Sequence, residues 1–266
     1  MNDQPERGRF PTENLSLLRY EAIIIEALKG RPGFGKQAAR SAVRHVNAAW
    51  RTRDSDLEMA VLRIITAEEE AAAAIFYSIK RKKYDGHQQI NLKSHMHKLA
   101  LGVFLRMLGD FFQTIHLVQE LDLRLDFTEG DGYVSTSFSG KPYGLDGRFK
   151  PIPPLHFSMK RDGLEYYFED EFKQFCERKN IKKMEEHIKE LAGMRHSLLY
   201  AVDAGIAECK VGQGFFDTRR RWIFFLLAIY VMVDSYREHQ LFVLHAVSAF
   251  CRMIRYVVPR DVGLES

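Results

Sequence analysis

The chain has 266 residues, of which 46% are hydrophobic and 28% are charged, as in an ordinary globular protein with a sizeable core. Its net charge of +4 permits contact with nucleic acid without requiring it. The three cysteines lie far apart and form no CxxC or Cys/His cluster, which argues against a disulfide framework or a zinc site. Reduced thiols in a cytoplasmic protein are the favoured interpretation.

Two features bear on a membrane location. The N-terminal stretch is polar and has no apolar core, so we do not expect a secretory signal. The longest apolar run, Trp222–Val233, falls short of the roughly 20 residues that span a bilayer, and Asp234 interrupts it. We therefore expect a buried core or interface helix, with a membrane span as the minor alternative.

Apolar periodicity predicts a mainly helical fold with a small antiparallel β insertion. Helices are expected over residues 15–29, 36–51, 55–82, 92–117, 169–207 and 217–257, the last broken near 234–235. Residues 120–168 alternate and carry turn signals, which predicts three or four short strands. The expected organisation is a disordered N-terminus (1–13), a first bundle part (14–118), the β insertion (119–168), a second bundle part (169–258) and a tail (259–266).

The third expected helix contains three adjacent acids, in the segment AEEEAAAAIFYSIK. Because three neighbours cover about 200° of a helix, at least one acid must face inward, and the apolar spacing selects Glu68. A buried carboxylate needs a cation or several donors, and Arg195 or His97 is the expected partner. A structural salt bridge and a site carboxylate remain equally open.

The stretch ELAGMRHSLLYAVD is the strongest candidate for chemistry. His196 and Tyr200 share one face of an apolar helix that also carries Arg195. Because buried polar groups need partners, these three side chains are candidate site residues.

Two further patterns are weaker candidates. His95 and His97 project to nearly opposite sides of a helix, so they cannot chelate one metal, and His97 is expected to be buried and hydrogen-bonded. The segment GRPGFGK has the spacing of a phosphate loop, but Gln37 replaces the Ser or Thr that would hold magnesium, and a helix precedes it. A glycine-rich helix end is the favoured interpretation.

Basic side chains gather at two places. Lys36, Arg40 and Arg44 form one helical stripe that could follow phosphates, although a solvated face is favoured. Residues 219–221 are three arginines in the first turn of the last helix, which Asp217 or Thr218 is expected to cap. Cations there oppose the helix dipole, so an acidic patch, another protein or RNA is a plausible partner.

The segments AEEEAAAAIFYSIK, KSHMHK and GMRHSLLYAVD, in this order on successive long helices, resemble the HEPN superfamily of helical bundles. Within it they look most like the AbiV-type abortive-infection proteins. The resemblance covers residues 15–118 and 169–257, and the β insertion lies outside it. It implies an HEPN-like helical bundle.

The superfamily resemblance also implies an Arg-x4-6-His motif and, in active members, a ribonuclease that needs no metal or other cofactor. Arg195 matches the arginine, but Tyr200 stands where histidine is expected, and a phenol is a poor base at neutral pH. His196 could substitute for it, with Glu68 as a further site residue. The pair Arg40 and His45 also fits the spacing.

The function expected from this resemblance is that of an antiphage or toxin-type protein acting on RNA. The alternative is a catalytically inactive HEPN module that binds a partner protein or nucleic acid. A purely structural helical protein is a third possibility. A homodimer is expected, through the motif helix or through Trp222–Val233. A partner defence or antitoxin protein is possible, and no membrane contact is expected.

Overall fold

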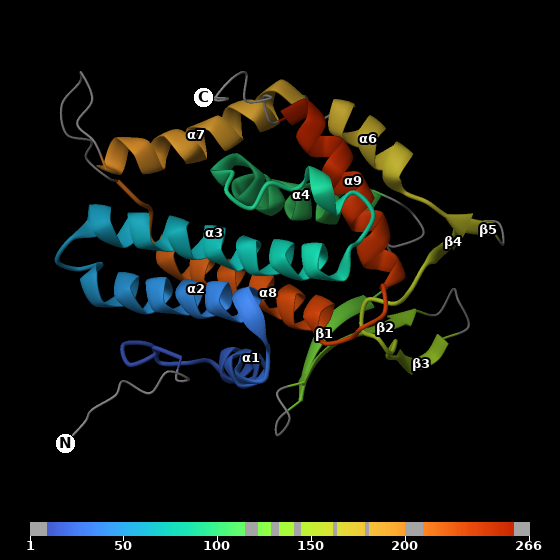
Figure 1. Ribbon diagram of the computed structural model, residues 1–266, viewed down its shortest axis with the longest axis horizontal. Helices are drawn as coiled ribbons and strands as arrows, with labels where there is room; N and C mark the ends of the chain where they lie inside the picture. Colours follow the sequence, from blue (N-terminus) through green and yellow to red (C-terminus); the bar gives the residue numbers. More distant parts are fainter. Residues whose placement is uncertain are drawn as a thin grey trace. The chain divides into compact units, whose positions relative to one another are not determined.

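The chain folds into a mainly helical protein with a small β region, as its sequence predicts (Figure 1). The computed structural model describes residues 10–114, 122–128, 133–140, 145–161, 164–178, 181–199 and 210–257. They fall into two compact units. Unit 1 contains Met1–Tyr77, Phe127–Val134 and Arg195–Ser235, and unit 2 contains Ser78–Asp126, Ser135–Met194 and Tyr236–Ser266.

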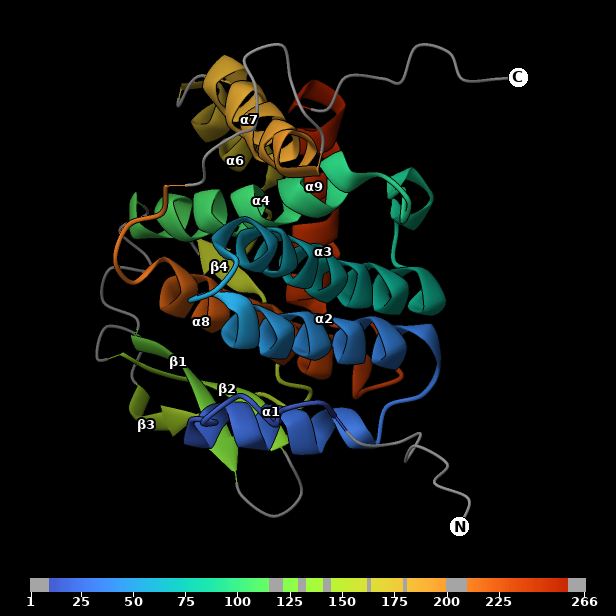
Figure 2. The same cartoon turned by 90° about the vertical axis from the view of Figure 1, so that its left-hand side faces the viewer.

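Unit 1 is built on long helices that pack side by side (Figures 1 and 2). They are α1 (Arg19–Lys29), α2 (Gly33–Thr52), most of α3 (Leu57–Lys82) and α8 (Phe215–Asp234). Apolar side chains of all four helices are fully enclosed, among them Ile24, Leu28, Val43, Val46, Ile64, Phe76, Phe224 and Leu227. This core supplies most of the burial that stabilises the unit.

Helix α1 begins at Arg19, four residues after the expected start at Leu15, and polar groups determine this position. The Glu21 carboxylate, in the first turn, accepts the backbone N–H of Leu18 at 2.8 Å. Such a contact fixes a helix start, because the first N–H groups of a helix have no partner within it. Of the N-terminal stretch expected to be disordered, residues 10–13 are described, and Phe10 is buried.

A close approach joins α2 to α8. A Cβ atom on Gly35 would lie 2.7 Å from the hydroxyl oxygen of Tyr230, which is fully buried. Only glycine fits there without moving a core side chain. The segment GRPGFGK thus joins two helices and has no strand before it, which agrees with a helix end and not with a phosphate loop.

Helix α8 contains the long apolar run. All of Trp222–Val233 is buried except Trp222, Phe225 and Ile229, which are half-buried. The run is therefore a core element and does not offer a broad exposed face for a second copy. The helix begins at Phe215 after Gly214, whose φ is +79°, and no side chain caps it, so the expectation of an Asp217 or Thr218 cap is wrong. Within the described ranges, no helix is both long and apolar enough to cross a bilayer.

The remaining helices and strands lie wholly or mostly in unit 2. They are the short helix η1 (His87–Gln89), α4 (His95–Thr114), α6 (Glu169–Arg178), α7 (Ile181–Leu199), α9 (Leu241–Val257), β1 (Asp122–Thr128), β2 (Tyr133–Gly140), β3 (Leu145–Phe149), β4 (Met159–Arg161) and β5 (Leu164–Tyr166). The helix expected over 169–207 is therefore two helices as far as Leu199, and the break expected near 234–235 is confirmed.

The β insertion forms two small sheets. The first has the order β1-β2-β3, and β2 pairs antiparallel with β3, with Phe138 opposite Phe149. The second is the antiparallel pair β4 and β5. The expected strands are thus present, but five are described where three or four were predicted.

A buried glutamine and many aromatic rings hold unit 2 together. Gln240 accepts the N–H of Leu155 at 2.8 Å through its side chain, and its own N–H donates to the Tyr84 hydroxyl at 3.0 Å. Helices α4, α6 and α9 contact one another, and ring pairs join α4 to both α6 and α9. The rings include Phe104, Phe111, Phe168, Phe172, Phe175, Phe242 and Phe250.

Candidate functional site

Arg195 and His196 of the expected motif lie near the end of α7. The helix expected around it is confirmed as far as Leu199. The side chains of Arg195 and His196, and Tyr200 altogether, lie outside the described residues. Their convergence on a reacting group therefore stays a prediction.

Glu68 is buried, as the apolar spacing of α3 predicts, with 5% of its surface exposed. One carboxylate oxygen accepts from Arg219 Nη1 at 2.7 Å, and the other accepts from Trp222 Nε1 at 3.1 Å. The expected cation from another helix is present, but it is Arg219 of α8, whereas the sequence pointed to Arg195 or His97. With a donor on each oxygen, Glu68 is suited to positioning Arg219.

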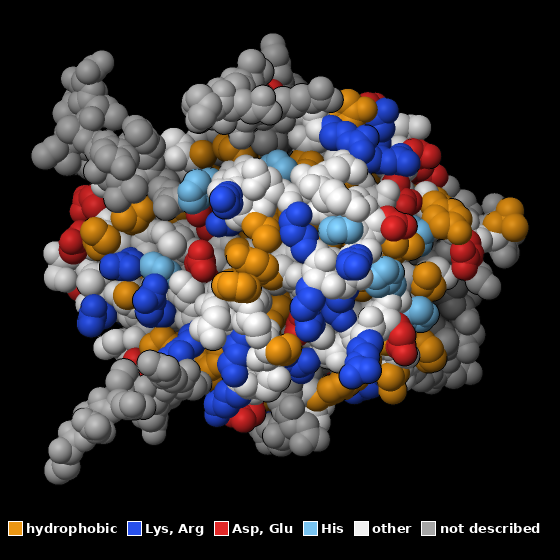
Figure 3. All heavy atoms as spheres, in the orientation of Figure 1, with side chains coloured by type: hydrophobic (Ala, Val, Ile, Leu, Met, Phe, Trp, Pro, Cys, Tyr) orange, Lys and Arg blue, Asp and Glu red, His pale blue; other side chains and the backbone are white. Residues whose placement is uncertain are grey.

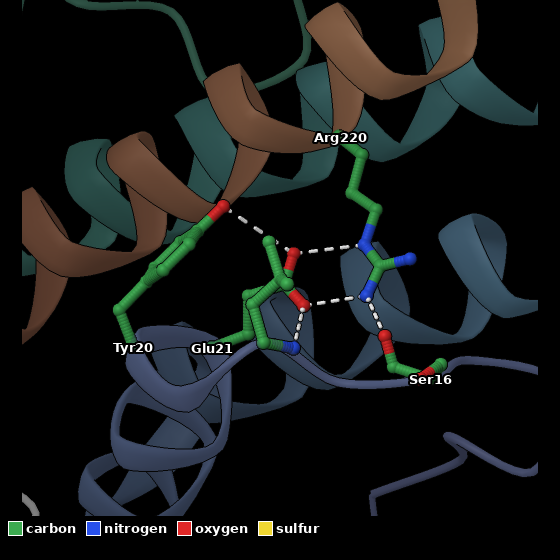
Figure 4. A network of polar contacts seen from close by, with 5 residues as sticks. Ser16, Tyr20, Glu21 and Arg220 are labelled. Carbon is green, nitrogen blue, oxygen red and sulfur yellow. Dashed lines mark hydrogen bonds and ion pairs between the residues drawn. The ribbon is translucent and has the colours of Figure 1, made fainter.

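A second buried ion pair lies nearby in unit 1, and Figure 4 shows it. Arg220 binds Glu21 through two nitrogens, Nε to Oε1 at 2.8 Å and Nη2 to Oε2 at 2.5 Å. Arg220 Nη2 also donates to the Ser16 carbonyl at 2.7 Å, and the Tyr20 hydroxyl donates to Oε1 at 3.5 Å. Burial, with Glu21 alongside, raises the pKa of Tyr20, so its hydroxyl keeps the proton that it donates.

Sequence reasoning missed Glu21, although a signal for it was available. Ile24, Ile25 and Leu28 follow it at spacings of three, four and seven, so Glu21 continues the apolar face of α1. Glu21 is fully buried, and Arg220 is 7% exposed. The same spacing that identified Glu68 identifies Glu21.

The three arginines at the start of α8 thus point in different directions. Residues that are neighbours in a helix project about 100° apart. Arg219 reaches α3 and Arg220 reaches α1, while Arg221 is exposed. For two of these cations the acidic partner belongs to the chain itself: Glu68 binds Arg219, and Glu21 binds Arg220.

His45 on α2 is buried next to Arg63 on α3. Arg63 Nη1 lies 3.3 Å from His45 Nδ1. Since a guanidinium only donates, Nδ1 accepts and Nε2 carries the proton of a neutral ring. Burial, together with the charges of Arg44 and Arg63, lowers the pKa of His45 to about 4.

The low pKa of His45 predicts a loss of stability in mild acid. An unfolded histidine has a pKa near 6.5, so between pH 6.5 and 4 the unfolded chain binds the extra proton. The stabilisation is complete above pH 6.5 and is lost as the pH falls toward 4. Integrating the difference in bound protons over pH gives a decrease of about 2 kcal/mol in the free energy of unfolding from pH 7 to pH 5. Urea unfolding at both pH values measures it.

The matched variant for this pH effect is His45→Gln, which cannot be protonated in this range. Its free energy of unfolding should change less than that of the wild type between pH 7 and pH 5, by the amount that His45 contributes. An identical change in both proteins would show that His45 does not titrate as proposed.

The basic stripe of α2 lies at the surface. Arg44 is exposed, and Lys36 and Arg40 are half-exposed. Lys36 Nζ donates to the Lys29 carbonyl at the end of α1, at 2.5 Å. The favoured interpretation as a solvated face agrees with this exposure.

The two histidines of α4 differ from expectation in one respect. His97 is hydrogen-bonded, since its Nδ1 accepts the N–H of Asn91 at 3.1 Å, but it is half-buried and not fully enclosed. His95 is exposed. In the part of the chain that the structure describes, no group of three His, Cys, Asp or Glu side chains is arranged to hold a metal.

The two described cysteines are core thiols. Burial raises the pKa of Cys176 to about 12 and that of Cys251 to about 11. Both thiols are therefore protonated and weakly nucleophilic at neutral pH. Cys209 lies outside the described residues.

No match to this chain is found among protein-family models, curated proteins or solved structures.

Proposed function

We propose that the chain is an HEPN-like protein of the antiphage or toxin type that acts on RNA as a metal-independent endoribonuclease. The supporting observation is the position of Arg195 and His196 next to each other in α7, with Tyr200 four residues after His196 in the sequence. A histidine can exchange protons with the ribose hydroxyl, and an arginine can stabilise the charge that builds on the phosphate.

In the proposed reaction, His196 takes the proton of the ribose 2′-OH, and the 2′ oxygen attacks the adjacent phosphorus. The bond to the 5′ oxygen of the next nucleotide breaks, which leaves a cyclic phosphate on the ribose, and the 5′ oxygen takes up the proton that His196 had accepted. Arg195 stabilises the negative charge that builds on the phosphate oxygens. Histidine is the side chain with an ordinary pKa near neutrality, and Tyr200 donates a hydrogen bond.

Glu68 has a positioning role in this proposal. Both of its oxygens already accept hydrogen bonds, from Arg219 and Trp222. A carboxylate held in this way is a poor proton acceptor for a substrate and a good anchor for Arg219.

Incubation of the purified chain with total cellular RNA tests the activity. We expect cleavage that survives a chelator and that falls roughly a hundred-fold or more in Arg195→Ala or His196→Ala. Tyr200→Phe should lose much less, because it removes only a hydrogen bond. His187→Ala, on the same helix outside the motif, serves as the matched control and should cleave like the wild type.

A specific departure favours a second candidate, a catalytically inactive HEPN module that binds a partner protein or nucleic acid. Tyr200 stands where active members have histidine. If the wild type and Arg195→Ala leave the same RNA pattern, catalysis at this motif is ruled out and the binding module replaces it. A homodimer through α7 and an antitoxin-type partner stay predictions.

A further inference from the structure

Two arginines of unit 1 differ in what their side chains bind. Arg220 uses Nε and Nη2, the two parallel donors on one side of its guanidinium, to bind both oxygens of Glu21. Arg63, on α3, has a single hydrogen bond among the described residues, from Nη1 to His45 Nδ1 at 3.3 Å. Its Nε and Nη2 donors therefore have no acceptor in the part of the chain that the structure describes.

The imidazole next to Arg63 does not neutralise it. His45 is 9% exposed, and its Nδ1 accepts the hydrogen bond from Arg63. Burial and the charges of Arg44 and Arg63 hold the pKa of His45 at about 4, so the ring is neutral at pH 7. The guanidinium of Arg63 thus keeps its full charge, and Arg44 adds a second positive charge at the same place.

No acid of the two helices balances these charges. Helix α2 contains no aspartate or glutamate. On α3, the neighbours of Arg63 at spacings of three and four are Met59, Ala60, Thr66 and Ala67. Glu68 binds Arg219, and Glu70 lies two turns further along α3, about 10 Å along the axis. Among the described residues, no carboxylate forms an ion pair with Arg63.

These cations can be reached from solvent. Arg44 is exposed and Arg63 is half-buried. Figure 3, in the orientation of Figure 1, shows basic side chains and a histidine together over α2 and α3. Because a guanidinium only donates, the ligand must be an acceptor, and its charge must be negative. Two parallel donors would use both oxygens of a carboxylate, whereas a phosphate keeps a further charged oxygen for the second cation.

We infer that Arg63, with Arg44 beside it, is a binding site for a phosphate group, and that His45 positions Arg63. Nε and Nη2 donate to two phosphate oxygens while Nη1 stays on His45 Nδ1, which fixes the direction of the guanidinium. The site goes beyond the proposed function, because it involves neither Arg195 nor His196. The group can come from inorganic phosphate or from the backbone of an RNA.

Isothermal titration calorimetry with inorganic phosphate at pH 7 and constant ionic strength tests the site. Arg63→Lys keeps the charge but loses the parallel donors, so it should raise Kd about tenfold, the effect of losing one charge-assisted hydrogen bond. The matched control is Arg178→Lys, at an exposed position of α6, which should bind like the wild type. Arg44→Gln should raise Kd about threefold, since it removes an exposed charge.

A second measurement uses the wild type and no variant of Arg63. A phosphate bound at Arg63 favours the charged form of the neighbouring ring, so saturating phosphate should raise the pKa of His45 from about 4 to about 5 or higher. The chemical shift of the ring Cε1–H reports this pKa, and His45→Gln assigns the signal. Sodium chloride of equal ionic strength is the control. The same pKa in both salts would mean that Arg63 is structural only.

The outcomes distinguish this site from the proposed activity. Absence of phosphate binding, or equal Kd for Arg63→Lys and Arg178→Lys, overturns the site even if the wild type cleaves RNA. Phosphate binding without cleavage supports the site and rejects only the ribonuclease.

An unstructured RNA of about 12 nucleotides, bound to proteins that carry Arg195→Ala, identifies the source of the phosphate. Weaker RNA binding by the Arg63→Lys protein assigns the site to the RNA backbone. Unchanged RNA binding, together with weakened binding of inorganic phosphate, supports the site as one for free phosphate.

Discussion

Replacing Glu21 with alanine is expected to lower the free energy of unfolding by about 3–5 kcal/mol. The change leaves the Arg220 guanidinium, only 7% exposed, without its carboxylate. It also removes the acceptor for the Leu18 N–H at the start of α1. Urea unfolding at neutral pH measures the loss, and an unchanged denaturant slope would confirm that the same surface unfolds.

The matched control for Glu21 lies on the same helix. Glu26 pairs with Lys29 at 2.6 Å, but both side chains are 52% exposed. Water screens such a pair, so Glu26→Ala should change stability by no more than about 0.5 kcal/mol. The double variant Glu21→Leu with Arg220→Met should recover much of the loss, since apolar replacement of a whole buried pair is often neutral. A Glu21→Ala loss below about 1 kcal/mol would contradict the pair's role.

The long helices of this protein follow from local patterns in the sequence. Gly30 ends α1 and the polar residues after Asp234 end α8, as expected, because these signals act on neighbouring residues. The start of α1 was placed four residues early. Its true start depends on the Glu21 carboxylate, which is held in place by a residue 199 positions away in sequence.

The grouping of the strands depends on distant contacts in the same way. Alternation and turn signals located the strands within residues 120–168, but nothing local says that β4 and β5 pair apart from β1, β2 and β3. Strand pairing is decided by packing and register across the fold, and short segments leave both open.

At the candidate site, the sequence predicted which residue is buried but not which residue it binds. Helical spacing correctly placed Glu68 in the interior, because burial follows from the face on which a residue lies. It did not identify Arg219, since the partner's identity depends on how α3 and α8 pack, across 151 positions of sequence. Glu21 was open to the same reasoning and was not recognised.

Two ion pairs connect the start of α8 to α1 and α3. Lysine or arginine near a helix N-terminus is unfavourable to the dipole, and here two carboxylates offset that effect. Glu21 on α1 and Glu68 on α3 bind the adjacent Arg220 and Arg219. Neighbouring residues of α8 therefore connect it to two other helices of unit 1, which gives these ion pairs a role in fixing the packing.

Replacing Glu68 with alanine should accordingly lower the free energy of unfolding by about 3 kcal/mol. The Glu68 side chain is 7% exposed and that of Arg219 is 18% exposed, so the guanidinium left behind is poorly hydrated. Trp222 Nε1 also loses the acceptor that the structure shows for it at 3.1 Å. Urea unfolding, with Glu58→Ala in the first turn of α3 as a comparison, measures the effect.

The isosteric change Glu68→Gln separates a positioning role from a catalytic one. The amide oxygen can still accept one hydrogen bond, from Arg219 or Trp222, so the variant should be more stable than Glu68→Ala. If Glu68 only positions Arg219, RNA cleavage by Glu68→Gln should stay within about tenfold of the wild type, well short of the loss for an acid–base group. A hundred-fold loss of cleavage in a variant that keeps its stability would instead make Glu68 a proton-transferring residue, which its two bound oxygens argue against.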